Sequence, residues 1–118
     1  MCDTEGVGKK QYLATRNVRE FIAAQPMEIQ AEYVKLVERI ECDGFLIEPF
    51  GKKLDRKLFE MRLRRGRQVR VIYYYHAGNH VIGLHAFVKK TQQTPLREIS
   101  QALRMKRIIE GGDYGEDK

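Results

Sequence analysis

The stretch LFEMRLRRGRQVRVIYYYHAGNHVIGLHAFVKK, residues 58–90, decides the fold because its apolar residues recur at the two-residue period of a β-strand. In LFEMRL the apolar residues alternate with Glu60 and Arg62. VRVIYYY follows a turn at Gly66, and VIGLHAFVKK, which is apolar on both faces, follows a second turn, HAGNH. The spacing predicts three antiparallel strands.

The residues on either side of this stretch have the spacing of helices. Asn17 opens a short helix that ends at Pro26, and a second helix runs from Pro26 to Gly44 with apolar residues at intervals of three and four. A short edge strand at 12–14 precedes them. A last helix starts at Thr94, followed by proline, and packs on the sheet or on a partner.

Length and composition indicate one domain. With 118 residues, 42% of them apolar, we expect a single unit at 12–109 with flexible tails at 1–11 and 110–118. No apolar run is long enough to span a bilayer, and the opening MCDTEGVGKKQ lacks the apolar core of a secretory signal. We therefore expect a cytoplasmic protein that does not bind membranes. Cys2 and Cys42 give no metal-ligand spacing, so no cofactor is expected.

Charge is segregated along the chain. Residues 1–50 hold six Lys/Arg and nine Asp/Glu, residues 51–109 hold fifteen and three, and residues 110–118 hold one and four. The net charges are therefore −3, +12 and −3, which give the total of +6. A basic block of this size attracts polyanions, and the phosphates of a nucleic acid are the main candidates. The alternative is a surface that only keeps the protein soluble.

Strand alternation predicts where the basic residues lie. If the alternate apolar residues of the strands, Ile82 and Leu84 among them, face the helices, the opposite face of the sheet is open and cationic. That face carries Arg62, Arg70, His85 and Lys89. The adjoining loops add Lys52, Lys53, Arg64, Arg65, Arg67 and Lys90. Tyr74, on the same face, is a candidate to stack on a base. This density of cations favours an RNA strand as the ligand.

RNA can be cleaved without a metal ion when its own 2′-hydroxyl is the nucleophile. The reaction needs a base, cations and an acid, which Lys, Arg and His can supply. A two-metal site is not expected, because Asp55, Glu60 and Glu98 do not occupy matching strand positions. Structural roles remain open: Arg62 as an ion-pair partner of Glu60 or Glu98, His85 as a hydrogen-bonded histidine, and the lysines as strand ends.

Three segments, LFEMRL, VRVIYYY and GLHAFVKKTQQTPLREISQA, together resemble the RelE/ParE toxin superfamily of bacterial toxin–antitoxin pairs. The resemblance is closest to the phage-derived, HigB-like branch and covers residues 12–109. Its signature is E-x-R, then a strand arginine before aromatic residues, then F-x-K-K-T before a Thr-Pro helix start. The resemblance implies an α+β, RelE-like fold, in which two N-terminal helices pack on a small antiparallel sheet and a C-terminal helix follows.

The resemblance also implies an activity. Members of this type are toxins of type II toxin–antitoxin systems that cut translated mRNA on the ribosome without a metal ion. The implied partners are therefore mRNA, the ribosome and a cognate helix-turn-helix antitoxin, HigA-like in kind. Two alternatives remain open: a ParE-like, non-nucleolytic inhibitor of gyrase, and a phage-derived RNA- or protein-binding module without catalysis.

The resemblance assigns the scissile phosphate to strand arginines and loop lysines. These map onto Arg62, Arg70, Lys89 and Lys90, with Lys52 and Lys53 before the first long strand. The tyrosine that several RelE-type members use has no counterpart, because the matching region holds Thr91 and Thr94 and Tyr114 lies in the acidic tail. The candidates for the general base are Lys89, Lys90 and His85. Lys89 is preferred because neighbouring cations lower the pKa of a lysine.

Overall fold

The computed structural model describes residues 9–111, which form a five-stranded sheet and three helices. The elements in chain order are β1 (Gln11–Ala14), α1 (Arg16–Ala23), α2 (Met27–Asp43), β2 (Gly51–Lys53), β3 (Phe59–Leu63), β4 (Val69–His76), β5 (His80–Val88) and α3 (Leu96–Glu110). The predicted α+β class and the order of its helices and main strands are confirmed. The predicted tails lie mostly outside the described residues, and so does Tyr114.

The sheet has the strand order β1-β5-β4-β3-β2. The strands β2 to β5 pair antiparallel with their neighbours, and β1 pairs parallel with β5 at the edge. The edge strand expected at 12–14 is present. The loop expected at Lys52 and Lys53 is wrong: both residues belong to β2, which is aligned so that Lys52 lies opposite Glu60. A three-residue strand is too short to show a period in the sequence.

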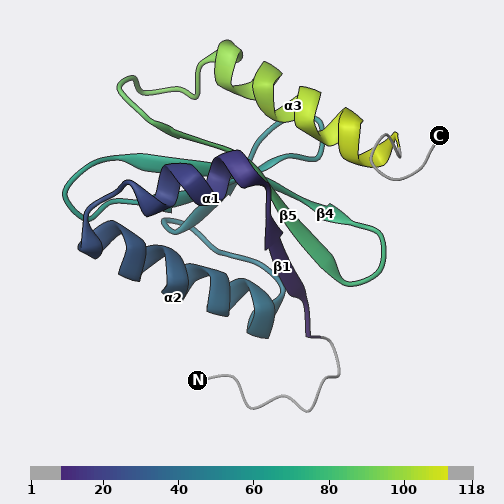
Figure 1. Ribbon diagram of the computed structural model, residues 1–118, viewed down its shortest axis with the longest axis horizontal. Coiled ribbons are helices and arrows are strands. Elements are labelled where there is room, and N and C mark those ends of the chain that lie inside the picture. Colours follow the sequence, from purple (N-terminus) through teal and green to yellow (C-terminus); the bar gives the residue numbers. More distant parts are fainter. Residues whose placement is uncertain (1–8, 112–118) are drawn as a thin grey trace.

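Helices α1 and α2 cover one face of the sheet and α3 covers part of the other (Figure 1). The α1/α2 face is apolar throughout its centre, where Val18, Ile29 and Ile40 pack against Val71 and other buried strand residues. Each is fully removed from solvent. Burying this much apolar surface supplies the main drive to fold.

The expectation of an open opposite face is wrong. Ala102 and Ile109 of α3 pack over that face, above Ile72 and Tyr74. An amphipathic helix buries its apolar stripe on any apolar surface within reach, and the strands supply one on their second face. The uncovered part of this face lies at the other end of the strands. None of the helices within residues 9–111 combines the length and apolar character needed to cross a membrane.

The facing predicted for Ile82 and Leu84 is also wrong, since both lie under α3. The pairing register shifts along the ladder: Ile72 lies opposite His85, but Tyr73 lies opposite Gly83, so that Leu84 is an extra residue in β5. Such a β-bulge shifts the alternation by one residue. Odd-numbered residues of β5 therefore face α1 and α2 before the bulge and even-numbered residues face them after it, which strict alternation does not predict.

Two helix starts differ from the prediction. Thr15, not Asn17, is the N-cap of α1, and its backbone N–H donates to the carbonyl of Gly83 at 3.0 Å. Pro95, not Thr94, is the N-cap of α3. At Thr15 this contact with the sheet fixes the point where the chain turns into α1. Gly44 ends α2 as predicted, with a positive φ of 91° that suits glycine.

Candidate functional site

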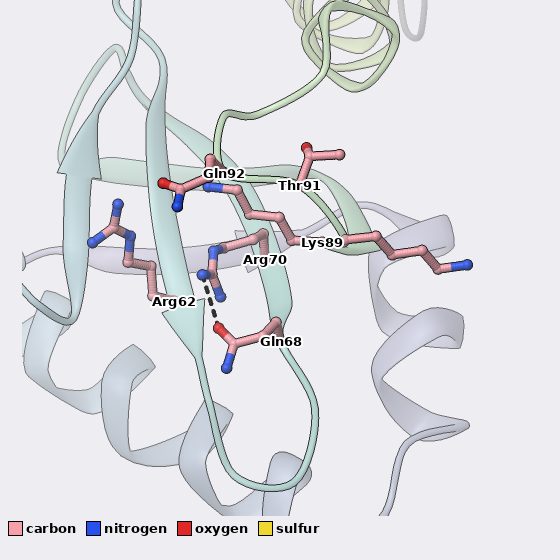
Figure 2. A pocket seen from close by; sticks show the side chains of 7 residues that line it. Arg62, Gln68, Arg70, Lys89, Thr91 and Gln92 are labelled. Atoms are coloured by element: carbon pink, nitrogen blue, oxygen red, sulfur yellow. Dashed lines mark hydrogen bonds between the residues drawn. The ribbon is translucent and has the colours of Figure 1, made fainter.

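A cationic hollow lies on the uncovered part of the α3 face, at the ends of β3, β4 and β5. It has a volume of about 470 Å³ and is lined by Arg62, Gln68, Arg70, Lys89, Lys90, Thr91 and Gln92. Figure 2 shows the side chains of Arg62, Arg70 and Lys89 on the same side of the sheet, with Gln92 beside Lys89. The four residues assigned to the scissile phosphate therefore all line one hollow.

Strand pairing is the reason that the two arginines meet. Arg62 of β3 and Arg70 of β4 are direct cross-strand partners, so their side chains project from the same face. Like charges opposite each other repel, and this pairing persists only with a compensating group. The next strand brings in Lys89, which follows the last residue of β5 and whose backbone N–H donates to the carbonyl of Gln68 at 2.7 Å.

The compensating group is Glu60, a carboxylate on β3 that is fully buried. Its Oε1 atom lies 3.5 Å from Arg62 Nε, 3.8 Å from Arg70 Nε and 3.9 Å from Lys89 Nζ. The sequence gives one signal for it, because Glu60 and Arg62 are two positions apart on one strand and so share a face. Gln68, Thr91 and Gln92 had no signal of this kind.

Arg70 is held in place but is not saturated with partners. Its Nη2 donates to the Gln68 side chain at 3.0 Å and its Nη1 to the Val69 carbonyl at 3.2 Å. Its Nε is buried and has no hydrogen-bond partner among the described residues. Burial lowers the pKa of Arg70 from its ordinary value, and neighbouring Arg62 lowers it too, whereas Glu60 raises it. Guanidinium nevertheless stays charged, and Nη1 and Nη2 each keep a second N–H that can donate to an incoming anion, whereas the buried Nε cannot.

Lys89 has the electrostatic surroundings expected of a proton-transfer group. Its side chain is only 7% exposed. Burial lowers the pKa of its ammonium group, and the charges of Arg70, Arg62 and Lys52 lower it further, while Glu60 opposes the shift. The direction agrees with the prediction, but burial is a larger cause than the neighbouring cations. A lysine with a lowered pKa gives up its proton more readily at neutral pH.

The other predicted residues lie around the hollow. Lys52 and Lys53 line a second hollow of about 470 Å³, which shares Lys89 and Gln92 with the first. The remaining loop cations, Arg64, Arg65 and Arg67, are exposed between β3 and β4. Their loop is tied to the helices, because the backbone N–H groups of Arg64 and Arg65 donate to Glu32 and the Arg67 side chain donates to Gln25.

His85 and Tyr74 are not part of the hollow. His85 Nε2 lies 2.5 Å from Glu98 Oε1 of α3, and its ring stacks on Phe87. This arrangement fits the hydrogen-bonded histidine that was one of its two interpretations. Tyr74 is 2% exposed beneath α3 and its hydroxyl pairs with His76 Nδ1 at 2.7 Å, so the base-stacking prediction is wrong for this structure. Its face was predicted correctly, but the helix covers it.

Within residues 9–111, no three His, Cys, Asp or Glu side chains come together in a group that could hold a metal ion. The hollow instead presents guanidinium, ammonium, amide and hydroxyl groups. These groups bind phosphate oxygens and stabilise negative charge that develops on them.

Comparison with known proteins identifies the family. Residues 20–107 match the family model of the phage-derived Gp49-like proteins. The chain belongs to this family. Among solved structures it is similar to the E. coli toxin RelE, in a double arginine-to-alanine mutant in the free state, with a TM-score of 0.61 and 12% sequence identity. The match covers 81% of this chain and 96% of the RelE chain. No curated protein gave a significant match.

The Gp49-like chain thus has a RelE-like fold, and the two findings together support the predicted resemblance to RelE-type proteins of phage origin. At this level of identity the structural likeness shows the fold alone.

Proposed function

We propose that this Gp49-like protein is the toxin of a type II toxin–antitoxin pair, and that it is a ribosome-dependent endoribonuclease that cleaves translated mRNA without a metal ion. One observation carries the proposal: Arg62, Arg70 and Lys89 converge on one hollow of a RelE-like fold. The family and the fold support the toxin class, and the cation cluster supports an RNA phosphate as the group that is bound.

The proposed reaction is transfer of the phosphorus from the 5′-oxygen to the 2′-oxygen of the same RNA strand. The 2′-hydroxyl loses its proton to a base and forms a bond to phosphorus, while the bond from phosphorus to the 5′-oxygen breaks and that oxygen takes up a proton. Arg62 and Arg70 hold the phosphate and stabilise the charge on its oxygens. Lys89 is the preferred base, and Lys90 is the candidate that donates the second proton.

The surrounding residues have supporting roles in this proposal. Lys52 and Lys53, beside the second hollow, bind the phosphates that flank the scissile one. The exposed arginines of the β3–β4 loop add affinity without sequence preference. His85 is left with a structural role through Glu98. The proposed setting is a single cytoplasmic domain at 12–109 that is inhibited by a HigA-like, helix-turn-helix antitoxin.

The test is to add purified protein to a translation reaction and to map the ends of the mRNA. Wild-type protein is expected to cleave the message. Arg70→Ala is expected to lower the cleavage rate about 10²- to 10³-fold, because it removes donors aimed at the phosphate. An intact message in the presence of active ribosomes would reject the nuclease. If DNA supercoiling by gyrase failed instead, the ParE-like alternative would replace it.

A further inference from the structure

Glu60 is a buried carboxylate that lines the second hollow, and its Oε1 atom lies against three cations of the first hollow. Its side chain is 0% exposed, and a buried charge is costly unless other charges or hydrogen bonds compensate it. The compensation here is threefold, since Oε1 lies within 3.9 Å of Arg62, Arg70 and Lys89. We call these four residues the inner cluster.

The second oxygen of Glu60 has a different partner. Oε2 accepts a hydrogen bond from the hydroxyl of Thr94, in the loop between β5 and α3. This loop also carries Thr91 and Gln92 into the hollow. A single carboxylate therefore connects β3, β4, the end of β5 and the loop, which are the four segments that build the hollow.

The charge of the inner cluster fits the reaction better than three cations alone would. With Lys89 neutral, as a base must be before it takes the proton, the two arginines and the carboxylate leave a net charge of +1, which becomes +2 once Lys89 is protonated. A phosphodiester carries one negative charge, and the phosphorane that forms as the 2′-oxygen attacks carries two. Catalysis requires that the site stabilise the transition state more than the substrate, and a net charge of +2 matches the phosphorane.

We propose that Glu60 is the positioning residue of the hollow: it holds Arg62, Arg70 and Lys89 at one point and sets their net charge, without contacting the RNA. The proposal rests on the proposed nuclease function for its effect on cleavage. Its effect on Lys89 is independent of RNA. Glu60 raises the pKa of Lys89 against burial and against Arg70, Arg62 and Lys52, so loss of the carboxylate moves the pKa of Lys89 lower.

Glu60→Gln keeps the shape of the side chain and removes its charge, and Glu38→Gln removes the same charge from the exposed surface of α2. The first readout is an NMR titration of isotope-labelled lysine side chains in the free protein, with the Lys89 signal assigned by its loss in Lys89→Met. Glu60→Gln is expected to shift the Lys89 midpoint to lower pH, whereas Glu38→Gln leaves it unchanged. An unchanged midpoint in Glu60→Gln overturns the inference, whatever the RNA result.

The second readout is mRNA cleavage on ribosomes as a function of pH. For Glu60→Gln we expect kcat to fall about 10²-fold, with KM equal to or lower than that of the wild type, because binding gains net positive charge while the geometry loosens. The limb of the pH profile that reports Lys89 should move to lower pH. Wild-type kcat in Glu60→Gln overturns the inference. If wild-type protein cleaves no RNA, the proposed function fails and the Lys89 titration still decides the role of Glu60.

Two further variants test the inference if the Glu60→Gln protein does not fold. Glu60→Asp draws the carboxylate back by one methylene, so the Lys89 midpoint should again move to lower pH, and no movement overturns the inference. Thr94→Val removes the hydroxyl and keeps the charge of Glu60. It should lower kcat and leave the Lys89 midpoint in place, which separates the position of the loop from the charge of the cluster. Wild-type kcat in Thr94→Val overturns the role given to the Thr94 contact.

Discussion

The face of the sheet that carries α3 has two halves of opposite chemistry, although the same central strands build both. In the covered half, Ile72, Ile82 and Leu84 pack under α3. In the uncovered half, Arg62 and Arg70 project from strands β3 and β4. Exclusion of water from the first half stabilises the folded protein. The second half keeps cationic side chains at the surface, where they can bind an anionic ligand. Because the two halves occupy different ends of the strands, stability and function should respond to different substitutions.

The largest effect is expected from the covered half. Leu84→Ala removes a fully buried side chain and should lower the free energy of unfolding by about 2–5 kcal/mol, measured by urea denaturation. The rate of RNA cleavage per folded molecule should be unchanged. Arg62→Ala is the matched variant of the uncovered half, and there the cleavage rate should fall while the stability cost is smaller, since Glu60 keeps two other cations. Equal losses of cleavage in both variants would break the comparison.

The second effect is a dependence of stability on alkaline pH, and it comes from two tyrosines on the α1/α2 face, Tyr12 and Tyr33. The hydroxyl of Tyr33 donates to that of Tyr12 at 2.9 Å, and burial raises the pKa of both above 10.0. The unfolded chain therefore loses these protons as the pH passes 10.0 while the folded chain keeps them, so their contribution to stability is present below pH 10.0 and is lost above it.

Tyr12→Phe should make the alkaline loss of stability shallower, as followed by thermal melting between neutral pH and the alkaline limit of folding. Leu13→Ala, an exposed residue of the same strand, is the control and should keep the wild-type slope. An alkaline slope that does not change in Tyr12→Phe would assign the loss to other groups.

The smallest effect is expected at the exposed loop beside the hollow. Arg65→Ala should weaken binding of single-stranded RNA modestly and should reduce the slope of log affinity against log salt by about 0.7, the value for one phosphate contact. The measurement is RNA binding at a series of salt concentrations, with Arg62→Ala alongside. If Arg65→Ala lost as much affinity as Arg62→Ala, the hollow would not be the main contact.

Much of the fold follows from local periods in the sequence. The alternation of LFEMRL and the intervals of α2 predicted their elements correctly, because each period is set by the element's own geometry. Alternation also predicted that Arg62 and Arg70 share a face of the sheet, and the structure adds that they are cross-strand partners. The family resemblance then predicted that Lys89 and Lys90 belong with them, and all four line one hollow.

What the sequence did not predict depends on contacts between elements. Helix α3 packs over Tyr74 because that face of the sheet has an apolar surface that can bury the apolar side of the helix. The spacing of residues within one element does not predict which face a helix will cover. β2 exists because Gly51–Lys53 finds a partner in β3. Glu60 looked like one more charged position on a strand, and only the three cations that surround it show why a buried carboxylate is tolerated there.

The bulge at Leu84 decides on which side of the sheet the end of β5 presents its charge. Before it, Val81 faces α1 and α2; after it, Ala86 does, which is a change from odd to even positions. In a strand of the same length without the extra residue, the phase of Val81 would continue and Lys89 would point into the apolar core. The extra residue thus reverses which side chains of β5 face α1 and α2. It allows a single strand to contribute to the core at one end and to the cationic hollow at the other.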